Sequence, residues 1–159
     1  YKPKTKKIYN LGIIPHYVDY QKVVNLYGHN KSILIIDVTK TNIETTIKEI
    51  LSCNRILSSS LHGLIISDAY NIPNKWIIFS NNINGDNVKF YDYFLSVSRV
   101  DKTPIHHITN QRINLANALQ SIRPVNINFD KKKLKSILFY DKNGFTRYIK
   151  YLYAKLKKN

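Results

Sequence analysis

The sequence predicts an α/β protein, built on a Rossmann-like parallel sheet with helices on both faces. Short apolar runs of the kind that form buried strands alternate three times with helical patterns within about 80 residues. The strand runs lack a strict polar alternation, which is typical of parallel strands covered on both faces. At 159 residues the chain is long enough for one domain with its own core, so we expect a single Rossmann-like domain over 1–159.

The first half supplies three strands and three helical segments. Residues 7–15 form an expected strand that ends at Pro15, and 19–27 form a short helix or an ordered loop. Residues 32–38 (SILIIDV) are the strongest strand signal. Thr41 and Asn42 offer caps for a helix through about Leu51, whose inner face we expect to carry Ile43, Ile47 and Ile50. A strand at 55–57 and a helix from Leu61 to about Tyr70 follow.

The second half is less regular. Residues 75–79 predict another buried strand, and 80–86 a loop with turn chemistry at Asn84-Gly85. Residues 88–94 fit a strand or the start of a helix equally well. A last strand is expected at 105–107, a helix at 110–122, and two more helices at 129–138 and 145–156, which make up a basic C-terminal segment over 130–159.

The formal net charge of +15 is the strongest compositional signal. It predicts attraction to polyanions, although lysines gather near the chain's ends and a charge run is most often a solvated face. Cys53 stands alone, so no internal disulfide can form, which suits a reducing compartment. No run reaches transmembrane length and no secretory signal is present, so we expect a cytoplasmic location. The chain begins at Tyr1 rather than Met, from which we expect a trimmed or processed piece of a longer chain.

One stretch passes directly from a strand to a helix through three hydroxyls: Ser58, Ser59 and Ser60. Such a junction leaves the first N–H groups of the helix unpaired at the sheet edge, and the helix dipole adds positive potential there. Ser60 is the natural N-cap and His62 lies in the first turn. An anion site and a capped core helix with one partly buried histidine are about equally supported by the spacing.

Other chemistries find little support. His106 and His107 are adjacent, which points them to opposite faces of a strand, and no cluster has the spacing of metal ligands, so we expect no metal. Nothing resembles the Gly-x-Ser-x-Gly elbow of serine hydrolases, a P-loop or a Gly-x-Gly-x-x-Gly turn.

Three segments resemble the polysaccharide pyruvyl transferase family. The stretch SSSLHGLIISDAYNIPNKWI looks like the family signature, and LGIIPHYVDY and GDNVKFYDYFLS flank it in the expected order, so the resemblance covers about 7–98. Weaker similarity continues in INLANALQSIRPVN. The resemblance implies transfer of pyruvate from phosphoenolpyruvate to a sugar of a surface or exopolysaccharide as a ketal, with no further cofactor.

The resemblance also implies roles for individual residues. The donor-binding histidine of the family falls on His62, which can stabilise phosphate as a cation or act as a general acid. The expected substrate-binding residues are Ser58, Ser59, Ser60, His16, Lys89 and Asp92. His16 is equally well explained as a structural histidine. Lys89 would counter the donor's charge, and Asp92 would orient a sugar hydroxyl or cap a turn. Tyr91 and Tyr93 would stack on a sugar, although simple packing is favoured, and Asp68 is expected to be structural.

The chain is about half as long as the family's usual enzymes, which are two-domain proteins of the glycosyltransferase-B fold. It resembles one half of that fold, the C-terminal half. We therefore expect a donor-binding half that is inactive alone and that needs an N-terminal domain or partner subunit. The acceptor would be a saccharide. If the saccharide is lipid-linked, we expect the protein to work at the inner face of the membrane.

Two hypotheses from other functional classes remain open. The charge and the twelve tyrosines suit a basic nucleic-acid-binding module, although no known RNA- or DNA-binding motif is present and a nucleic-acid partner is disfavoured. A non-catalytic scaffold subunit of a glycan-synthesis complex would keep the fold without turnover. The helix at 145–156 also has a basic amphipathic pattern that suits peripheral contact with an anionic membrane. The alternative is that its apolar face packs onto the domain.

Overall fold

The computed structural model describes residues 1, 3–83, 85, 87–130 and 132. The chain divides into two compact units, residues 1–127 and 128–159, and all the elements described below belong to the first. The expected helices at 129–138 and 145–156, and with them the basic segment proposed to contact a membrane, lie outside the described residues apart from Phe129, Asp130 and Lys132.

A five-stranded parallel sheet forms the centre of the first unit, with the strand order β2-β1-β3-β4-β5. Its strands are β1 (Leu11–Ile14), β2 (Ile33–Ile35), β3 (Ile56–Ser58), β4 (Asn74–Ile78) and β5 (Ile105–His106). The register pairs Ile13 with Leu57 and Ile14 with Ser58, so β1 and β3 end side by side. The expected α/β fold with a Rossmann-like parallel sheet is confirmed.

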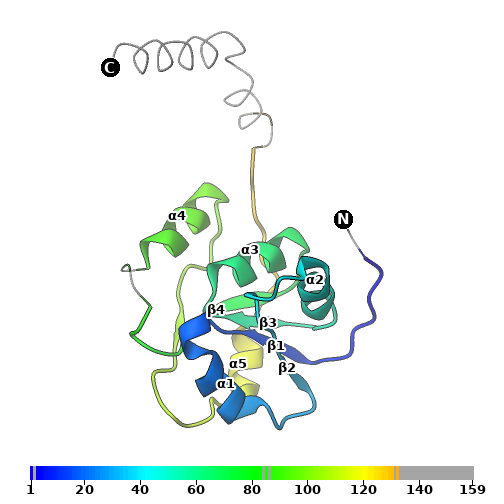
Figure 1. The fold of residues 1–159 in the computed structure, drawn as a ribbon. Coiled ribbons are helices and arrows are strands. Elements are labelled where there is room, and N and C mark those ends of the chain that lie inside the picture. The colour runs from blue at the N-terminus through cyan, green and yellow to red at the C-terminus, as the bar shows by residue number, and fades with distance from the viewer. Residues whose placement is uncertain (2, 84, 86, 131, 133–159) are drawn as a thin grey trace, which may run out of the picture. The chain divides into compact units, whose positions relative to one another are not determined.

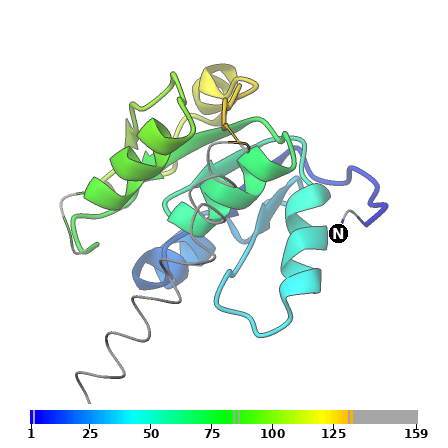
Figure 2. The same cartoon turned by 90° about the horizontal axis from the view of Figure 1, so that it is seen from above.

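Helices cover both faces of this sheet (Figure 1). They are η1 (Tyr17–Asp19, a 3-10 turn), α1 (Tyr20–Tyr27), α2 (Ile43–Leu51), α3 (Leu61–Ala69), α4 (Val88–Ser96) and α5 (Leu115–Ser121). The chain moves from β1 to β2 in one direction and then from β2 to β5 in the other. Because such crossovers are right-handed, the reversal places α1 on one face and α2, α3 and α4 on the other, as Figures 1 and 2 show.

Three clusters of buried side chains hold the layers together. On the face covered by α1 and α5, the strands pack Leu11, Ile13, Leu57, Ile77 and Phe79 against Val23, Tyr27, Ala118 and Ile122. On the opposite face one cluster lies under α2 and α3, and a second packs Leu64, Trp76, Ile78, Phe90 and Phe94 beneath α4. The continuous apolar runs of the sequence therefore supply buried side chains to both faces of the sheet, as expected of parallel strands.

The first strand is shorter than predicted. β1 begins at Leu11 rather than at Lys7, since Ile8 is 70% exposed and only an isolated bridge joins Tyr9 to Cys53. The run at 32–38 yields only the three residues of β2, which lies at the edge of the sheet.

Helix α2 confirms one part of its prediction and corrects another. The side chain of Asn42 caps it, because Asn42 Oδ1 accepts a hydrogen bond from the Thr45 N–H at 3.1 Å. Ile50 is buried as predicted, but Ile43 is 69% exposed, since the first turn of the helix extends past the apolar cluster beneath it.

The undecided segment at 88–94 is helical. Phe90 and Phe94 lie one turn apart and are both fully buried against Trp76, which a helix satisfies and an alternating strand would not. The helix expected at 110–122 begins only at Leu115, because Asn114 caps it and the preceding loop is held to α1 by a 2.8 Å hydrogen bond from the Ile113 N–H to Tyr27 Oη.

Candidate functional site

The carboxyl ends of β1 and β3 are neighbours whose following segments leave on opposite faces of the sheet. β1 continues through Pro15 and His16 into η1 and α1, whereas β3 continues through Ser59 and Ser60 into α3. In open α/β sheets, ligands bind beyond the carboxyl ends of the strands at such a topological switch point. The predicted residues His16, Ser58–Ser60 and His62 therefore all belong to one edge of the sheet.

The three serines form a buried turn. Ser58 and Ser59 are fully buried and Ser60 is 4% exposed. Ser58 Oγ donates towards Ser60 O at 2.7 Å and accepts from the Ser60 N–H at 3.1 Å, so its hydroxyl closes the turn on itself. Ser59 Oγ accepts a 2.8 Å hydrogen bond from the His16 N–H, which joins the two strand ends. The hydroxyls of Ser58 and Ser59 are thus engaged with the protein.

The N-terminus of α3 is open. Ser60 has the extended backbone of an N-cap, but its side chain forms no capping hydrogen bond, contrary to the prediction. The described residues offer no acceptor to the N–H groups of Leu61, His62 and Gly63, and the first helical bond runs from the Leu64 N–H to Ser60 O at 3.3 Å. Three donors and the positive end of the helix dipole therefore remain for an anion.

Gly63 lets this helix start lie close to the strands. A Cβ at that position would stand 2.4 Å from Ser58 Oγ and 2.9 Å from Ile14 Cγ2, distances that a real side chain cannot occupy. The small residue one place after His62 thus fixes how near the helix start comes to the switch point.

The side chain of His62 is exposed and lies on the side of α3 that faces α2. It lines a hollow of about 270 Å³ together with Lys40, Thr46 and the apolar side chains of Val38, Ile43, Ile47 and Ile66. Lys40 forms an ion pair with Glu49 at 2.9 Å. The imidazole therefore borders the open helix start on the side of α2.

His16 borders the same helix start on the side of β1. Burial and the positive charge of Lys89 lower the pKa of its imidazole, while Asp19 opposes the shift. Its Nδ1 is buried and has no hydrogen-bond partner among the described residues. A neutral ring with an unused nitrogen is thus held at the switch point, its orientation supported by Tyr17 at a ring separation of 4.5 Å.

Lys89 reaches this edge from a third element. It lies in the first turn of α4, is exposed, and places its Nζ 5.7 Å from the centroid of the Phe90 ring. Its charge is close enough to lower the pKa of His16, so α4 contributes positive charge near the end of β1. Asp92 lies three residues further along α4, is exposed, and has no hydrogen bond or ion pair with any residue that the structure describes.

Sequence reasoning missed the buried network that holds α4 in place. Arg99 Nη1 contacts both carboxylate oxygens of Asp68 at 3.1 and 3.0 Å, and both side chains are fully buried. Asn74 and Tyr93 complete the network, with Tyr93 Oη donating to Asp68 Oδ2 at 2.8 Å. Burial and this carboxylate raise the pKa of Tyr93. Asp68 is structural as predicted, and the Tyr93 hydroxyl is committed to the core.

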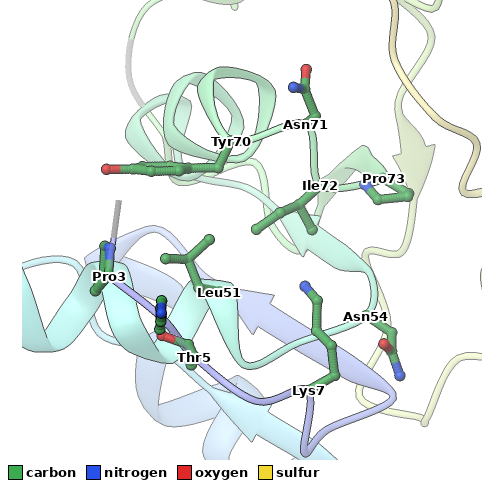
Figure 3. Close-up of a pocket in the computed structure, with 10 residues that line it drawn as sticks. Pro3, Thr5, Lys7, Leu51, Asn54, Tyr70, Asn71, Ile72 and Pro73 are labelled. Carbon is green, nitrogen blue, oxygen red and sulfur yellow. The ribbon is translucent and has the colours of Figure 1, made fainter. Parts of the chain in front are cut away.

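A larger hollow, of about 480 Å³, lies at the opposite edge of the sheet (Figure 3). Leu51, Tyr70 and Ile72 surround it, and the N-terminal segment closes it with Pro3, Thr5 and Lys7. It contains none of the residues predicted for the site, and it lies at the amino ends of the strands, away from the switch point.

Over the described ranges, no group of three or more His, Cys, Asp or Glu residues could hold a metal ion. No helix within those ranges is long and apolar enough to cross a membrane.

The fold and this edge define a Rossmann-like α/β protein with an open helix N-terminus at its switch point. The chain belongs to the polysaccharide pyruvyl transferase family, whose sequence model matches residues 3–82. We expected a likeness to the C-terminal half of the family's enzymes extending to Ser98; the match occupies the N-terminal half of this chain and ends before Lys89 and Asp92.

One curated relative is an uncharacterised protein of Acanthamoeba polyphaga mimivirus, 37% identical over 102 residues. The aligned region covers 62% of this chain and 35% of the relative, so this chain spans about a third of the relative's length. No solved structure matches the chain, and the resemblance to one half of a glycosyltransferase-B fold stays a prediction.

Proposed function

We propose that this chain binds phosphoenolpyruvate at the carboxyl ends of β1 and β3 and forms the donor-binding part of a pyruvyl transferase that acts on a saccharide. The observation that carries the proposal is the open start of α3 after β3, which a hydrogen bond joins to His16 after β1. The N–H groups of Leu61–Gly63 have no acceptor among the described residues, His62 lies in the same turn, and Lys89 is close enough to lower the pKa of His16. Family membership supports a transferase in general terms.

The donor carries a phosphate and a carboxylate, both of which suit this edge. The free N–H groups of α3 would bind one of the two anionic groups, and Lys89 would balance the charge of the other. His16 would contribute a neutral imidazole at the border of the site. Ser58 and Ser59 would act indirectly, by holding the turn that presents the N–H groups.

The reaction balances with an acceptor that supplies two hydroxyls. A proton adds to the methylene carbon of the enol phosphate, the two oxygens form bonds to the neighbouring carbon, and the carbon–oxygen bond to phosphate breaks. One hydroxyl proton ends in the new methyl group and the other on the released phosphate. His62 would either donate the proton to the enol carbon or stabilise the departing phosphate as a cation.

Calorimetric titration with phosphoenolpyruvate tests the donor site. We expect binding by this chain and a loss of about tenfold or more in His62→Ala and in Lys89→Met, because each removes a charge or hydrogen bond to the anion. His29→Ala is the matched control, since His29 is exposed after α1 at the other end of the strands. Equal affinity in all four proteins, or no affinity in any of them, would refute the proposal.

Turnover is a separate question. We expect the chain alone to release no phosphate from phosphoenolpyruvate and a saccharide, because the remaining residues would come from another domain or a partner subunit. Ketal formation by this chain alone would contradict that expectation while leaving the donor site in place.

A further inference from the structure

The hollow of about 480 Å³ at the amino ends of the strands has apolar walls (Figure 3). The walls are formed by four partly exposed side chains, those of Pro3, Leu51, Tyr70 and Pro73. The Tyr70 hydroxyl donates a 2.6 Å hydrogen bond to Tyr1 O, which ties the N-terminal segment to the end of α3. The hollow has the size of a small-molecule site, and an aromatic ring among aliphatic side chains suits a flat apolar group.

The charge of this lining is positive. Lys4 and Lys7 belong to it, and no carboxylate does among the described residues. Neither lysine forms an ion pair within the described part of the chain. The hollow beside His62 differs in this respect, because the ammonium of Lys40 is paired there with Glu49 at 2.9 Å. A concave surface that carries charge of one sign attracts ligands of the opposite sign, so this hollow favours an anion.

Lys7 holds its ammonium at a defined place. Its Nζ donates a hydrogen bond to Cys53 O, just after α2, and Figure 3 shows the side chain extending into the hollow. An ammonium has three hydrogens, so two remain for a ligand. Partial burial lowers the pKa of Lys7, which means that its charge is poorly hydrated and that an anion beside it would offset the cost.

We propose that this hollow binds a small aromatic carboxylic acid, with the carboxylate on the ammonium of Lys7 and the ring between Leu51 and Tyr70. Lys4 would add to the attraction. The site lies at the amino ends of β3 and β4, which Asn54 and Pro73 precede, whereas the phosphoenolpyruvate site is proposed at the carboxyl ends. The assignment therefore does not depend on the proposed function, and either can fail without the other.

NMR titration of the isotope-labelled chain tests this site. The probe is phenylacetate, and the backbone amides of Thr5, Asn54 and Asn71 report on the hollow. We expect their signals to shift saturably, with affinity about fivefold or more weaker in Lys7→Met and in Tyr70→Ala. Tyr70→Ala leaves the ammonium in place and serves as the second test if Lys7→Met alters the fold.

The matched control variant is Lys31→Met. Lys31 is an exposed lysine before β2 at the same edge of the sheet and lies outside the lining, so its replacement changes the net charge equally. Acetate and benzyl alcohol test the two halves of the probe separately, and phenyl phosphate tests whether a phosphate replaces the carboxylate. We expect each of the three to bind more weakly than phenylacetate.

The outcomes divide clearly. Loss of affinity in the two lining variants but not in Lys31→Met, with phenylacetate the tightest of the four compounds, supports the site. No saturable shift with phenylacetate, or equal affinity in all three variants, overturns it. Equal binding of acetate or of benzyl alcohol would mean that charge or apolar contact alone suffices, and tighter binding of phenyl phosphate would assign the hollow to phosphate; each of these results overturns the aromatic carboxylate.

Discussion

The backbone N–H of His16 donates a hydrogen bond of 2.8 Å to Ser59 Oγ, and the two residues lie 43 positions apart in the sequence. This bond closes the gap between the ends of β1 and β3 at the point where the chain changes from one face of the sheet to the other. With the hydrogen bonds that the Ser59 N–H and Ser58 Oγ donate to Ile14 O, it holds the residues after β1 against the turn that precedes α3.

Replacing Ser59 by alanine removes this acceptor. Because the His16 N–H is then left without its partner, we expect a loss of about 1–3 kcal/mol in the free energy of unfolding. Urea denaturation of Ser59→Ala beside Thr41→Ala, an exposed hydroxyl with no side-chain hydrogen bond described, measures the difference. Equal stability of the two variants would mean that the bond does not hold the strand ends together.

Adding a methyl group at Gly63 forces the start of α3 away from the strands. The new Cβ would overlap Ser58 Oγ and Ile14, so we expect Gly63→Ala to cost about 1–3 kcal/mol despite the better helix propensity of alanine. Thermal unfolding provides the measurement. A Gly63→Ala protein that is more stable than the wild type would show that the start of α3 can accommodate a methyl group.

The buried pair of Arg99 and Asp68 is expected to be costly to break. Arg99→Met leaves a carboxylate uncompensated in the core, which typically destabilises a protein by about 3–5 kcal/mol. Lys40→Met breaks the more exposed pair with Glu49 and is expected to cost about 1 kcal/mol or less. Denaturant unfolding of the two variants in parallel gives the comparison, and similar losses would argue against a special role for the buried pair.

Lys89 is predicted to contribute, after burial, to the lowered pKa of His16. Removing its charge in Lys89→Met should raise the pKa of His16 towards the ordinary value of 6.5, because Lys89 is one of the two causes that lower it. Lys48→Met, on the exposed side of α2, should leave it unchanged. NMR titration of the His16 ring protons measures this shift directly.

The same depressed pKa links stability to pH. Between the folded pKa of His16 and 6.5, the unfolded chain binds the proton and the folded chain does not. The stability contribution is therefore complete above 6.5 and is lost as the pH falls towards the folded pKa. Urea midpoints of the wild type should fall more steeply than those of His16→Gln between pH 7 and pH 5, and parallel curves would contradict the assignment.

Cys53 is expected to be inert in the folded protein. It is fully buried, and burial raises the pKa of its thiol to about 11, so little thiolate exists near neutral pH. Iodoacetamide at pH 8 should label the chain only in denaturant. Rapid labelling of the native protein would show that the contacts around Cys53 open readily.

Much of the fold is predictable because it depends on local patterns. Apolar runs of strand length, separated by capped helical segments, place β1 to β4 and the helices between them, and Asn42 caps α2 as its position in the sequence suggests. Local patterns fail where burial depends on a distant element. Ile43 has the correct helical spacing but lies beyond the end of the cluster beneath α2, and β2 is shortened at the sheet edge.

The site is predictable in outline and less so in its contacts. The position of the helix start follows from the strand-to-helix junction, but the use of Ser58 and Ser59 depends on where Ile14 and His16 lie in a different strand. Arg99 carries no local signal for its pairing with Asp68, 31 residues earlier. Likewise, Asn81 and His106 line one hollow only because β4 and β5 pair in the folded sheet.

The sheet ends on each side in a very short strand, three residues in β2 and two in β5. An edge strand offers unpaired backbone groups to other chains, and the number it offers grows with its length. This sheet therefore presents a poor template for strand addition, and the protein should resist edge-to-edge aggregation at high concentration even though its strands are among the most apolar segments of the sequence.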